Sequence, residues 1–290
     1  MCLLLPKNGI GGGVNKRLDQ KDPIAKIPGL GESRREKSVL KYLVIFFCTA
    51  ALMIGFAKTI EPRMEPLQMK VSVIIPCAGK HFELLPNLLD LYRQQTCLPD
   101  EVVISLSSIE TLKAEEIDAL ENSPWPFKVS ILRAEGKQSP GLNRNIAVSH
   151  ATGDVIISQD ADDLPHPQRV EIIKYMFENY AVDHLLHKWI AEGEAITPYE
   201  KNHVPIHGFD RYDDIGRTAL GDRMHNGNNA CSRAVVDRIH WVDVKKLDSD
   251  QDVKFNRDVY DAFEHTAVIP CELIVYRWRL SVLLQNQKND

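Results

Sequence analysis

The hydrophobic positions after residue 70 follow the order expected of alternating strands and helices. Short runs rich in β-branched residues, typical of buried strands, are separated by longer segments whose apolar positions fall on one helical face. This order is typical of a parallel sheet with right-handed crossovers, so it predicts an α/β domain with helices on both faces. The expected strands are 71–76, 100–105, 127–134, 154–158 and 184–190, and the expected helices are 82–95, 110–121, 140–150 and 168–180.

A different hydrophobic pattern precedes this domain. The run from Val39 to Ala57 is apolar on every side, and at about 1.5 Å per residue it is roughly 28 Å long, close to a hydrocarbon core of ~30 Å. A buried core helix and a cleavable signal sequence are less consistent with such a run far from Met1. Basic residues are more numerous before it than after it, which favours a cytosolic N-terminus.

These patterns predict a single-pass type II membrane protein of the Golgi or endoplasmic reticulum, with its globular domain in the lumen. Four segments are expected: a disordered cytosolic tail over 1–38, a transmembrane helix over 39–57, a stem over 58–70 and a globular domain over 71–285.

The acidic charge of the globular part limits the kinds of molecule that it can bind. The 290-residue chain has a net charge of −5, and the excess of Asp and Glu lies in the globular part. An acidic domain repels phosphate backbones, which excludes a nucleic-acid binder, although a nucleotide can bind when a divalent cation lies between the two negative partners. The six cysteines show no zinc-ligand spacing.

A carboxylate cluster follows the fourth expected strand. Asp160, Asp162 and Asp163 stand within four residues, at a strand end where parallel sheets bind ligands. Such carboxylates repel one another unless a cation is shared, and they can hold Mg²⁺ or Mn²⁺ while leaving positions for a diphosphate. A solvated Asp-rich turn is the alternative. We therefore expect all three as candidate metal ligands.

From about Val71 to Ser281 the chain resembles the family 2 glycosyltransferases. The resemblance rests on VSVIIP at 71–76, Arg144-Asn145, Ala-Thr-Gly-Asp at 151–154, Asp-Ala-Asp-Asp at 160–163 and Gln-Asp-Val-Lys-Phe at 251–255. It implies the A-type glycosyltransferase fold, with a Rossmann-like, mainly parallel sheet, and a catalytic domain over 71–285.

The resemblance also implies roles for single residues. Asp160 would contact the nucleoside or sugar of the donor, Asp162 would ligate the metal, and Arg144 and Pro76 would lie at the nucleotide. The family's second strand commonly ends in a carboxylate that reads the nucleobase, whereas this strand ends without one. Either Ser107 replaces that contact or donor recognition differs.

Inverting sugar transfer needs a base that accepts the proton of the acceptor hydroxyl. The family pattern places it at Asp252, with Gln251 where a Glu is usual, and Asp250 is a second candidate. The alternative for both is the electrostatic preference for Asp at a helix N-terminus. A polar loop over 192–224 is suited to covering a substrate, and Arg277 could meet the diphosphate.

The sequence thus predicts a metal-dependent inverting glycosyltransferase. It would use Mn²⁺ or Mg²⁺, a nucleotide-diphosphate sugar as donor, and a glycan, protein or lipid as acceptor. Two alternatives remain: a catalytically degenerate relative that binds carbohydrate or nucleotide sugar, and a sugar-phosphate nucleotidyltransferase. The nucleotidyltransferase usually has a Gly-rich basic loop after its first strand, which the loop at 77–81 resembles poorly.

Overall fold

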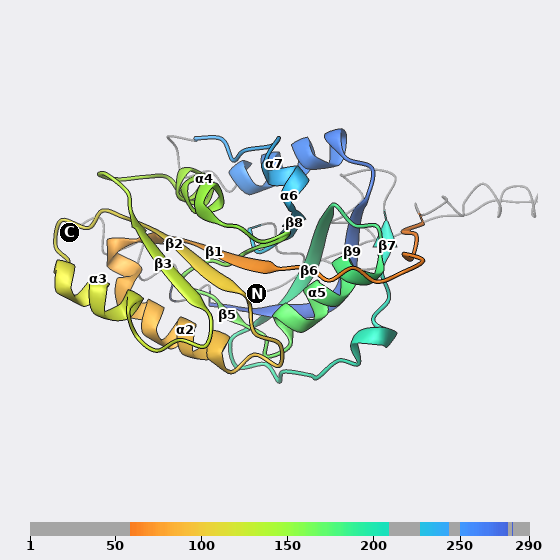
Figure 1. Cartoon of the computed structure of the whole chain (residues 1–290), viewed down its shortest axis with the longest axis horizontal. Coiled ribbons are helices and arrows are strands. Elements are labelled where there is room, and N and C mark those ends of the chain that lie inside the picture. The colour runs from red at the N-terminus through yellow and green to blue at the C-terminus, as the bar shows by residue number, and fades with distance from the viewer. Residues whose placement is uncertain (1–58, 209–226, 244–249, 278–279, 281–290) are drawn as a thin grey trace, which may run out of the picture. The chain divides into compact units, whose positions relative to one another are not determined.

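The computed structural model describes residues 59–208, 227–243, 250–277 and 280 (Figure 1). The expected cytosolic tail and transmembrane helix lie outside these residues. Within the described part of the chain, no helix is both long and apolar enough to cross a membrane.

A nine-stranded sheet forms the centre of the described domain. The strand order is β3-β2-β1-β4-β8-β6-β9-β5, with β7 paired to β9 outside this path. The first four strands are parallel to one another and β9 is parallel to β6, whereas β8, β5 and β7 pair antiparallel with their neighbours. The strands are β1 Val71–Ala78, β2 Glu101–Ser107, β3 Lys128–Arg133, β4 Val155–Ser158, β5 Leu164–Pro165, β6 His184–Ala191, β7 His207–Gly208, β8 Ala230–Ser232 and β9 Thr266–Tyr276.

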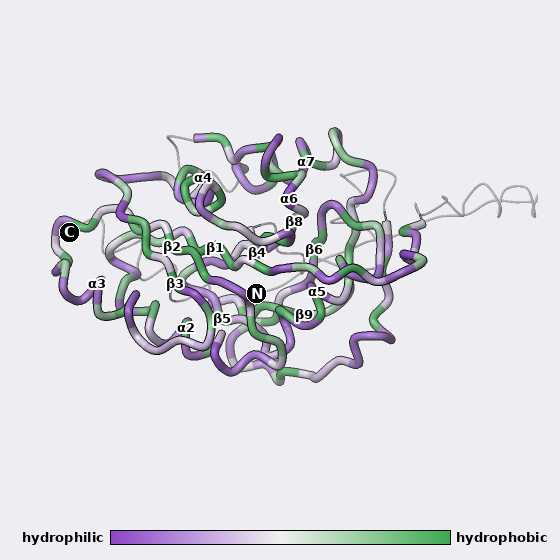
Figure 2. The backbone as a smooth tube through the Cα atoms, in the orientation of Figure 1, coloured by the Kyte–Doolittle hydropathy of each residue, from purple (hydrophilic) through white to green (hydrophobic). Residues whose placement is uncertain are grey.

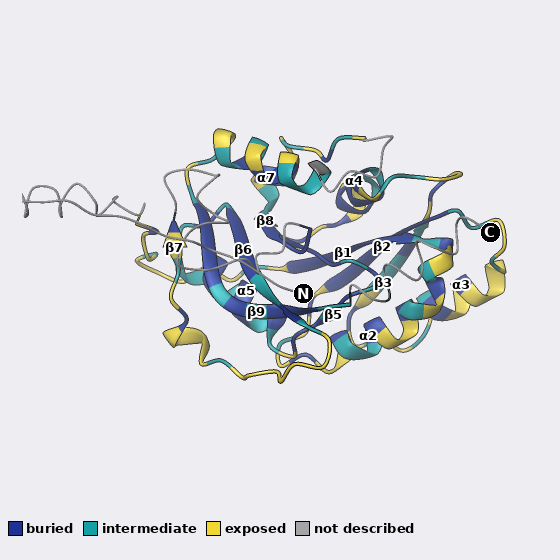
Figure 3. Ribbon diagram, turned by 180° about the vertical axis from the view of Figure 1, so that it is seen from behind, coloured by how far each residue is buried: buried dark blue, intermediate teal, exposed yellow. Residues whose placement is uncertain are grey.

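Helices cover both faces of this sheet. Figure 1 shows α2, α3 and α5 on one face and α4, α6 and α7 on the other. Hydrophobic residues concentrate on the strands, and the strands at the centre of the sheet are buried (Figures 2 and 3). The helices are η1 Gly79–Leu84, α2 Leu85–Arg93, α3 Ala114–Glu121, α4 Pro140–His150, α5 Arg169–Asn179, η2 Lys201–His203, α6 Arg233–Val236 and α7 Asp250–Ala262.

Each face of the sheet has its own hydrophobic core. The larger core lies between the sheet and α2, α3 and α5, and the smaller one lies between the sheet and α4, α6 and α7. The predicted mixed α/β architecture with a mainly parallel sheet is therefore confirmed.

The expected elements are present, with shifted ends. Helix α4 has the predicted bounds, whereas the helix expected over 82–95 begins at Leu85, with Pro86 in its first turn, where the missing N–H costs nothing. Strand β1 continues past Pro76 to Ala78. The ladder between β1 and β4 ends at the pair of Ile74 and Ser158, so Pro76 breaks no hydrogen bond with β4.

Strand β9 is an element that the sequence pattern did not predict. Pro270 stands inside it and disfavours a strand assignment. The register of β6 against β9 shifts between the pairs of His187 with Ile269 and Lys188 with Glu272. Pro270 lies in this irregularity, where its missing N–H removes no ladder bond.

The segment expected as a stem is partly attached to the domain. Pro62 forms a β-bridge with Tyr180, and the backbone N–H of Arg63 donates to the carbonyl of Asn179 at 2.7 Å. Ile60 is buried in the larger core. Residues 60–63 therefore pack on the domain near the end of α5.

The Ala-Thr-Gly-Asp motif has a structural explanation. Glu101 is buried and accepts hydrogen bonds from the Ser72 hydroxyl and from the backbone N–H and hydroxyl of Thr152. Burial raises the pKa of Glu101, but these hydrogen bonds outweigh it and hold the pKa below its usual value. The N–H of Gly153 in turn donates to the Ser72 hydroxyl at 2.7 Å.

Gly153→Ala is expected to destabilise the domain by about 1–3 kcal/mol. A Cβ at this position would lie 2.6 Å from the backbone nitrogen and the hydroxyl of Ser72, so β1 would have to move. Urea denaturation measures the change. The control is Gly136→Asn, at a position with φ +60° and open space around the new side chain, and an equal loss in the control would contradict the steric explanation.

Candidate active site

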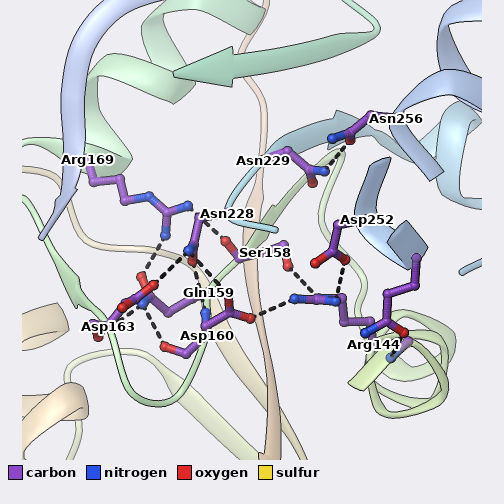
Figure 4. Close-up of polar contacts among 12 residues, drawn as sticks. Arg144, Ser158, Gln159, Asp160, Asp163, Arg169, Asn228, Asn229, Asp252 and Asn256 are labelled. Carbon is purple, nitrogen blue, oxygen red and sulfur yellow. Dashed lines mark hydrogen bonds and ion pairs between the residues drawn. The ribbon is translucent and has the colours of Figure 1, made fainter. Parts of the chain in front are cut away.

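Residues 159–163, between β4 and β5, form a loop with three aspartates that is called the acidic loop below. Buried polar side chains beneath this loop hold it in place. The Gln159 amide donates to the carbonyls of Asp160 at 2.8 Å and Asp163 at 3.2 Å. Its oxygen accepts from the Tyr92 hydroxyl at 2.9 Å. The same oxygen accepts from Arg169 at 2.7 Å (Figure 4). Gln159 and Arg169 are both fully buried. Buried polar side chains of the core therefore help to fix the backbone of the loop.

Asp163 joins the acidic loop to two distant segments. Its carboxylate accepts from the Asn228 amide at 3.0 Å and from the backbone N–H of Arg277 at 3.1 Å. Asp163 is almost completely buried, and this burial, together with the charges of Asp160 and Asp162, raises its pKa well above the usual value. In this arrangement the Asp163 side chain fastens the loop to β9 and to the segment before β8.

Asp162 is half-buried, and its carbonyl accepts a hydrogen bond from Nε of Arg277 at 2.6 Å. Its charge also contributes to the raised pKa values of Cys77 and Tyr276, after burial as the main cause. No group of three or more His, Cys, Asp or Glu side chains is arranged to hold a metal ion within the described part of the chain. Asp160, Asp162 and Asp163 nevertheless stand within four residues at this end of the sheet.

Arg144 connects the acidic loop to helix α7. Its two terminal nitrogens lie 2.6 Å from Oδ1 of Asp160 and 2.6 Å from Oδ1 of Asp252, and its Nε donates to the Ser158 hydroxyl at 3.2 Å (Figure 4). Its side chain is only 2% exposed. Burial lowers the pKa of Arg144, but the two carboxylates together raise it by more than burial lowers it. The guanidinium therefore stays charged. The expected place of Arg144 near the nucleotide stays a prediction.

Asp252, the predicted base, therefore lies beside the predicted donor site. Burial raises its pKa, Arg144 acts in the opposite direction, and Asp160 raises it again. Trp241 stacks on Phe255, with ring centroids 3.7 Å apart, and lies 5.9 Å from the Arg144 guanidinium. These aromatic rings limit water around the ion pairs.

The contact of Gln251 with helix α4 explains why Gln is tolerated at this position. Its side-chain oxygen accepts from the backbone N–H of Gly141 at 3.2 Å, at the first turn of that helix. A neutral amide is sufficient for this bond, so Gln in place of Glu leaves α7 docked on α4. Asp250 is the first residue of α7, and its side chain lies outside the described positions, so its role as a second base candidate stays a prediction.

Gly227 is a site residue that the sequence did not single out. A Cβ on it would lie 3.0 Å from Oδ2 of Asp252, and 3.1 Å from both Oδ2 of Asp160 and the Arg144 guanidinium. The backbone at Gly227 thus lies directly against the three charged groups. In the sequence, the only sign of this close approach is that the residue is a glycine, because any side chain would collide with the charged groups.

The two residues following Gly227 fix this segment. The Asn228 side-chain oxygen accepts from the backbone N–H of Asp160 at 2.9 Å, and Asn229 donates to Asn256 at 2.7 Å (Figure 4). Asn256 is one helical turn after Asp252 on α7. The segment 227–229 therefore holds the acidic loop and the base helix in one hydrogen-bonded group.

Ser107 and Pro76 lie inside the sheet. Ser107 is fully buried, and its hydroxyl accepts from the Asn143 amide at 2.9 Å, while Asn143 also accepts from the Ser105 hydroxyl at 3.0 Å. Pro76 is buried within β1. Ser107 is thus part of a hydrogen-bonded link between β2 and α4, and Pro76 is a buried residue of β1 paired with Ser105 of β2. The contacts of both residues with a nucleotide stay predictions.

The sequence profile described as glycosyl transferase family 2 matches residues 72–239, which is more than half of the chain. The chain belongs to this family. Among curated proteins, an uncharacterized glycosyltransferase of Methanocaldococcus jannaschii, MJ1057, is 31% identical over 121 residues, which are 41% of this chain and 41% of that protein. An uncharacterized glycosyltransferase of Haemophilus influenzae is 27% identical over 118 residues, covering 40% of this chain and 38% of that protein. The match thus spans about two fifths of each relative.

Solved structures show the same fold at low sequence identity. S. aureus TarS 1–349 superposes with a TM-score of 0.53 and 18% identity, over 72% of this chain and 60% of that chain. The complex of the same protein with UDP-GlcNAc gives a TM-score of 0.54 at 17% identity, over 72% and 58% of the two chains. The expected A-type fold is therefore confirmed for this family 2 chain.

Gly227→Ala is expected to lower the free energy of unfolding by about 1–3 kcal/mol, because the added methyl group pushes on a buried ion-pair network. Thermal and urea unfolding measure this loss. Gly193→Asn is the matched control, since Gly193 has a positive φ and open space around its Cβ position. A Gly227→Ala protein as stable as wild type would show that the segment is not confined by the three charged groups.

Proposed function

We propose that this chain transfers a sugar from a nucleotide-diphosphate donor to a hydroxyl of an acceptor, with inversion at the anomeric carbon. The observation that carries the proposal is the bridge by Arg144, with 2.6 Å contacts to Asp160 in the acidic loop and to Asp252 on α7. It brings the carboxylate expected at the donor next to the carboxylate expected to act as base. The likeness to TarS, whose structure was solved with UDP-GlcNAc, supports a nucleotide sugar as donor.

In this reaction Asp252 accepts the proton of the acceptor hydroxyl while that oxygen attacks the anomeric carbon. The bond from the anomeric carbon to the diphosphate breaks, and the nucleoside diphosphate leaves with its electron pair. Arg144 keeps the Asp252 carboxylate ionised and aimed, because its guanidinium opposes the effect of burial on the pKa. Such a base contributes about 10²- to 10⁴-fold to the rate.

The acidic loop fits a divalent cation. Its donors are carboxylate oxygens, which Mg²⁺ and Mn²⁺ prefer, and three aspartates within four residues carry charges that a cation would offset. Asp162 and Asp160 would hold it, with Asp163 keeping the loop in place. When bound, the ion would neutralise charge on the leaving diphosphate.

A catalytically inactive, carbohydrate-binding relative is the second candidate. The absence of a carboxylate at the end of β2, where Ser107 is buried against Asn143, favours it. Release of nucleoside diphosphate from a donor by the wild-type protein separates the two candidates, since a binding relative would release none. Membership of family 2 leaves the nucleotidyltransferase alternative without support.

The membrane-bound state belongs to the same proposal. The transmembrane helix over 39–57, the lumenal position of the domain in the Golgi or endoplasmic reticulum, and a glycan, protein or lipid acceptor are supported by the sequence pattern.

Asp252→Asn is expected to lower kcat by at least about 10²-fold while the affinity for UDP stays within a few-fold of wild type. An amide cannot accept the acceptor's proton, but it still occupies the same space. Steady-state kinetics and calorimetric titration with UDP measure the two effects. Asp258→Asn is the control, since Asp258 lies on the same helix in a surface pair with Lys254.

The pH profile gives a second measurement of the same base. Activity of the wild-type protein should fall as the pH drops through the pKa of Asp252, because only the ionised carboxylate accepts a proton, and this pKa lies above the usual aspartate value. Near-full turnover by Asp252→Asn across the whole profile would contradict the assignment.

Asp162→Asn is expected to remove the dependence of donor binding on Mn²⁺. In the wild-type protein, chelation by EDTA should weaken UDP-GlcNAc binding, whereas in the variant the affinities with Mn²⁺ and with EDTA should agree, since one ligand charge is gone. Asp118→Asn, on the exposed side of α3, is the control. If the variant kept the full Mn²⁺ effect, Asp162 would not be a ligand.

A further inference from the structure

Arg277, directly after β9, is attached to the acidic loop and has no role in the reaction described above. Its backbone N–H donates to the Asp163 carboxylate at 3.1 Å, and its Nε donates to the carbonyl of Asp162 at 2.6 Å. Two residues earlier in β9, Val275 pairs with Leu164, which directly follows the loop. Two hydrogen bonds and a strand pair therefore fix the main chain and the Nε of Arg277 against the loop.

The terminal nitrogens of Arg277 are available for a ligand. Among the residues that the structure describes, they have no hydrogen-bond acceptor and no carboxylate within ion-pair distance. Arg277 is half-buried, so part of the residue is exposed to solvent. A guanidinium that is held through Nε still offers its terminal N–H groups as a fork, which matches the oxygens of a phosphate.

Two other arginines near the acidic loop are not available in this way. Arg144 is only 2% exposed, and each of its three nitrogens already has a partner. Arg169 is completely buried and donates to groups of the core. A phosphate could reach neither guanidinium without breaking a buried network. Of the three arginines, Arg277 is therefore the one that can meet an anion at the loop.

The positive charge of Arg277 has opposite effects on a cation bound alone and on a cation bound with a diphosphate. Arg277 is bonded to the carbonyl of Asp162, the aspartate proposed as a metal ligand, so its charge repels a divalent cation at that aspartate. A diphosphate reverses the effect, because its negative charge attracts the cation and the guanidinium together. The position of Arg277 thus favours the pair of cation and diphosphate over the cation alone.

We propose that Arg277 binds the diphosphate of the donor and makes the acidic loop prefer a cation that binds together with a diphosphate. The inference rests on the proposed function, since it assigns a residue to the diphosphate of that reaction. The terminal N–H groups donate to oxygens of the diphosphate. The contact strengthens as the bond to the anomeric carbon breaks, because the leaving nucleoside diphosphate gains negative charge.

The test uses the full chain and separates the charge of Arg277 from its bond to Asp162. In Arg277→Gln the amide nitrogen is as many bonds from the main chain as Nε of arginine, so the donor is kept while the charge and the terminal nitrogens are lost. Arg277→Met removes the donor as well. Arg238→Gln is the control, because Arg238 is exposed and lies over Phe263, beyond the opposite end of α7 from Asp252.

Two titrations are compared for each protein. Mn²⁺ alone is titrated until the wild-type protein is saturated, with the free ion measured by electron paramagnetic resonance. UDP and GDP, and then UMP and GMP, are titrated by calorimetry with Mn²⁺ present. The monophosphates measure binding that does not need the second phosphate.

Arg277→Gln should bind the nucleoside diphosphate that wild type prefers roughly 10- to 100-fold more weakly, because charge-assisted hydrogen bonds to phosphate are lost. The loss for the monophosphate should be smaller. The affinity for Mn²⁺ alone should stay equal or rise by up to about fivefold, because a repelling charge is gone. Arg277→Met should show the same loss for the diphosphate, and Arg238→Gln should match wild type.

Equal losses for Mn²⁺ alone and for the nucleoside diphosphate in Arg277→Gln would mean that Arg277 acts only by holding the loop, and would overturn the proposal. If Arg277→Gln is not folded by thermal unfolding, Arg277→Lys carries the test. This variant keeps the charge but not the fork, so it should bind Mn²⁺ alone as wild type does and the diphosphate a few-fold more weakly. Unchanged diphosphate binding by Arg277→Lys would then overturn the proposal.

The two proposals fail in different ways. A wild-type protein that binds neither UDP nor GDP contradicts the proposed function. A wild-type protein that binds one of them, with the affinity of Arg277→Gln within about twofold of it, overturns the diphosphate contact alone.

Discussion

The ion pairs of Arg144 are the interaction on which the site depends. A guanidinium that is 2% exposed is costly unless its charge is compensated, and here the compensation comes from Asp160 in the acidic loop and from Asp252 on α7. Loss of either carboxylate would leave a buried charge with half of its partners. The fold is therefore required to bring α7 onto the acidic loop, and this requirement places the predicted base at the predicted donor site.

A second buried arginine holds the same strand end from the other face of the sheet. Arg144, from α4, donates to the hydroxyl of Ser158, and Arg169, from α5, donates to its carbonyl at 2.8 Å. The last residue of β4 is thus bonded from above and below, and the loop that follows starts from a fixed position. We expect an acidic loop held in this way by the core to lose little freedom on binding the proposed donor, which is how preorganised sites gain affinity and rate.

Local patterns in the sequence were sufficient for the parallel half of the domain and for the place of the acidic loop after β4, whereas Asp252 as the base stays a prediction. Strands β1, β2 and β4 have near-continuous buried residues bounded by turn residues, whereas β3 at the sheet edge is only partly buried. Ser139 with Pro140 is a strong helix start, so α4 could be predicted to the residue. Strand β9 could not, because Pro270 is tolerated only through a register shift against β6, which is a property of two strands rather than of one. The position of Gly227 in the site could not be predicted for a similar reason. Its place against Asp252 depends on segments far apart in the sequence, and no spacing or periodicity records a contact with a missing side chain.

The expectation about Ser107 shows how a departure from a family pattern can be compensated inside the structure. The chain has Asn143 on α4, and serines at 105 and 107 near the end of β2. The three side chains satisfy one another, with Asn143 also donating to the carbonyl of Cys77 at 3.4 Å. A carboxylate at position 107 would be buried in this group, where desolvation opposes its charge. The neutral Ser107 and the Asn143 amide are therefore compatible with each other, whereas a carboxylate at 107 would not be.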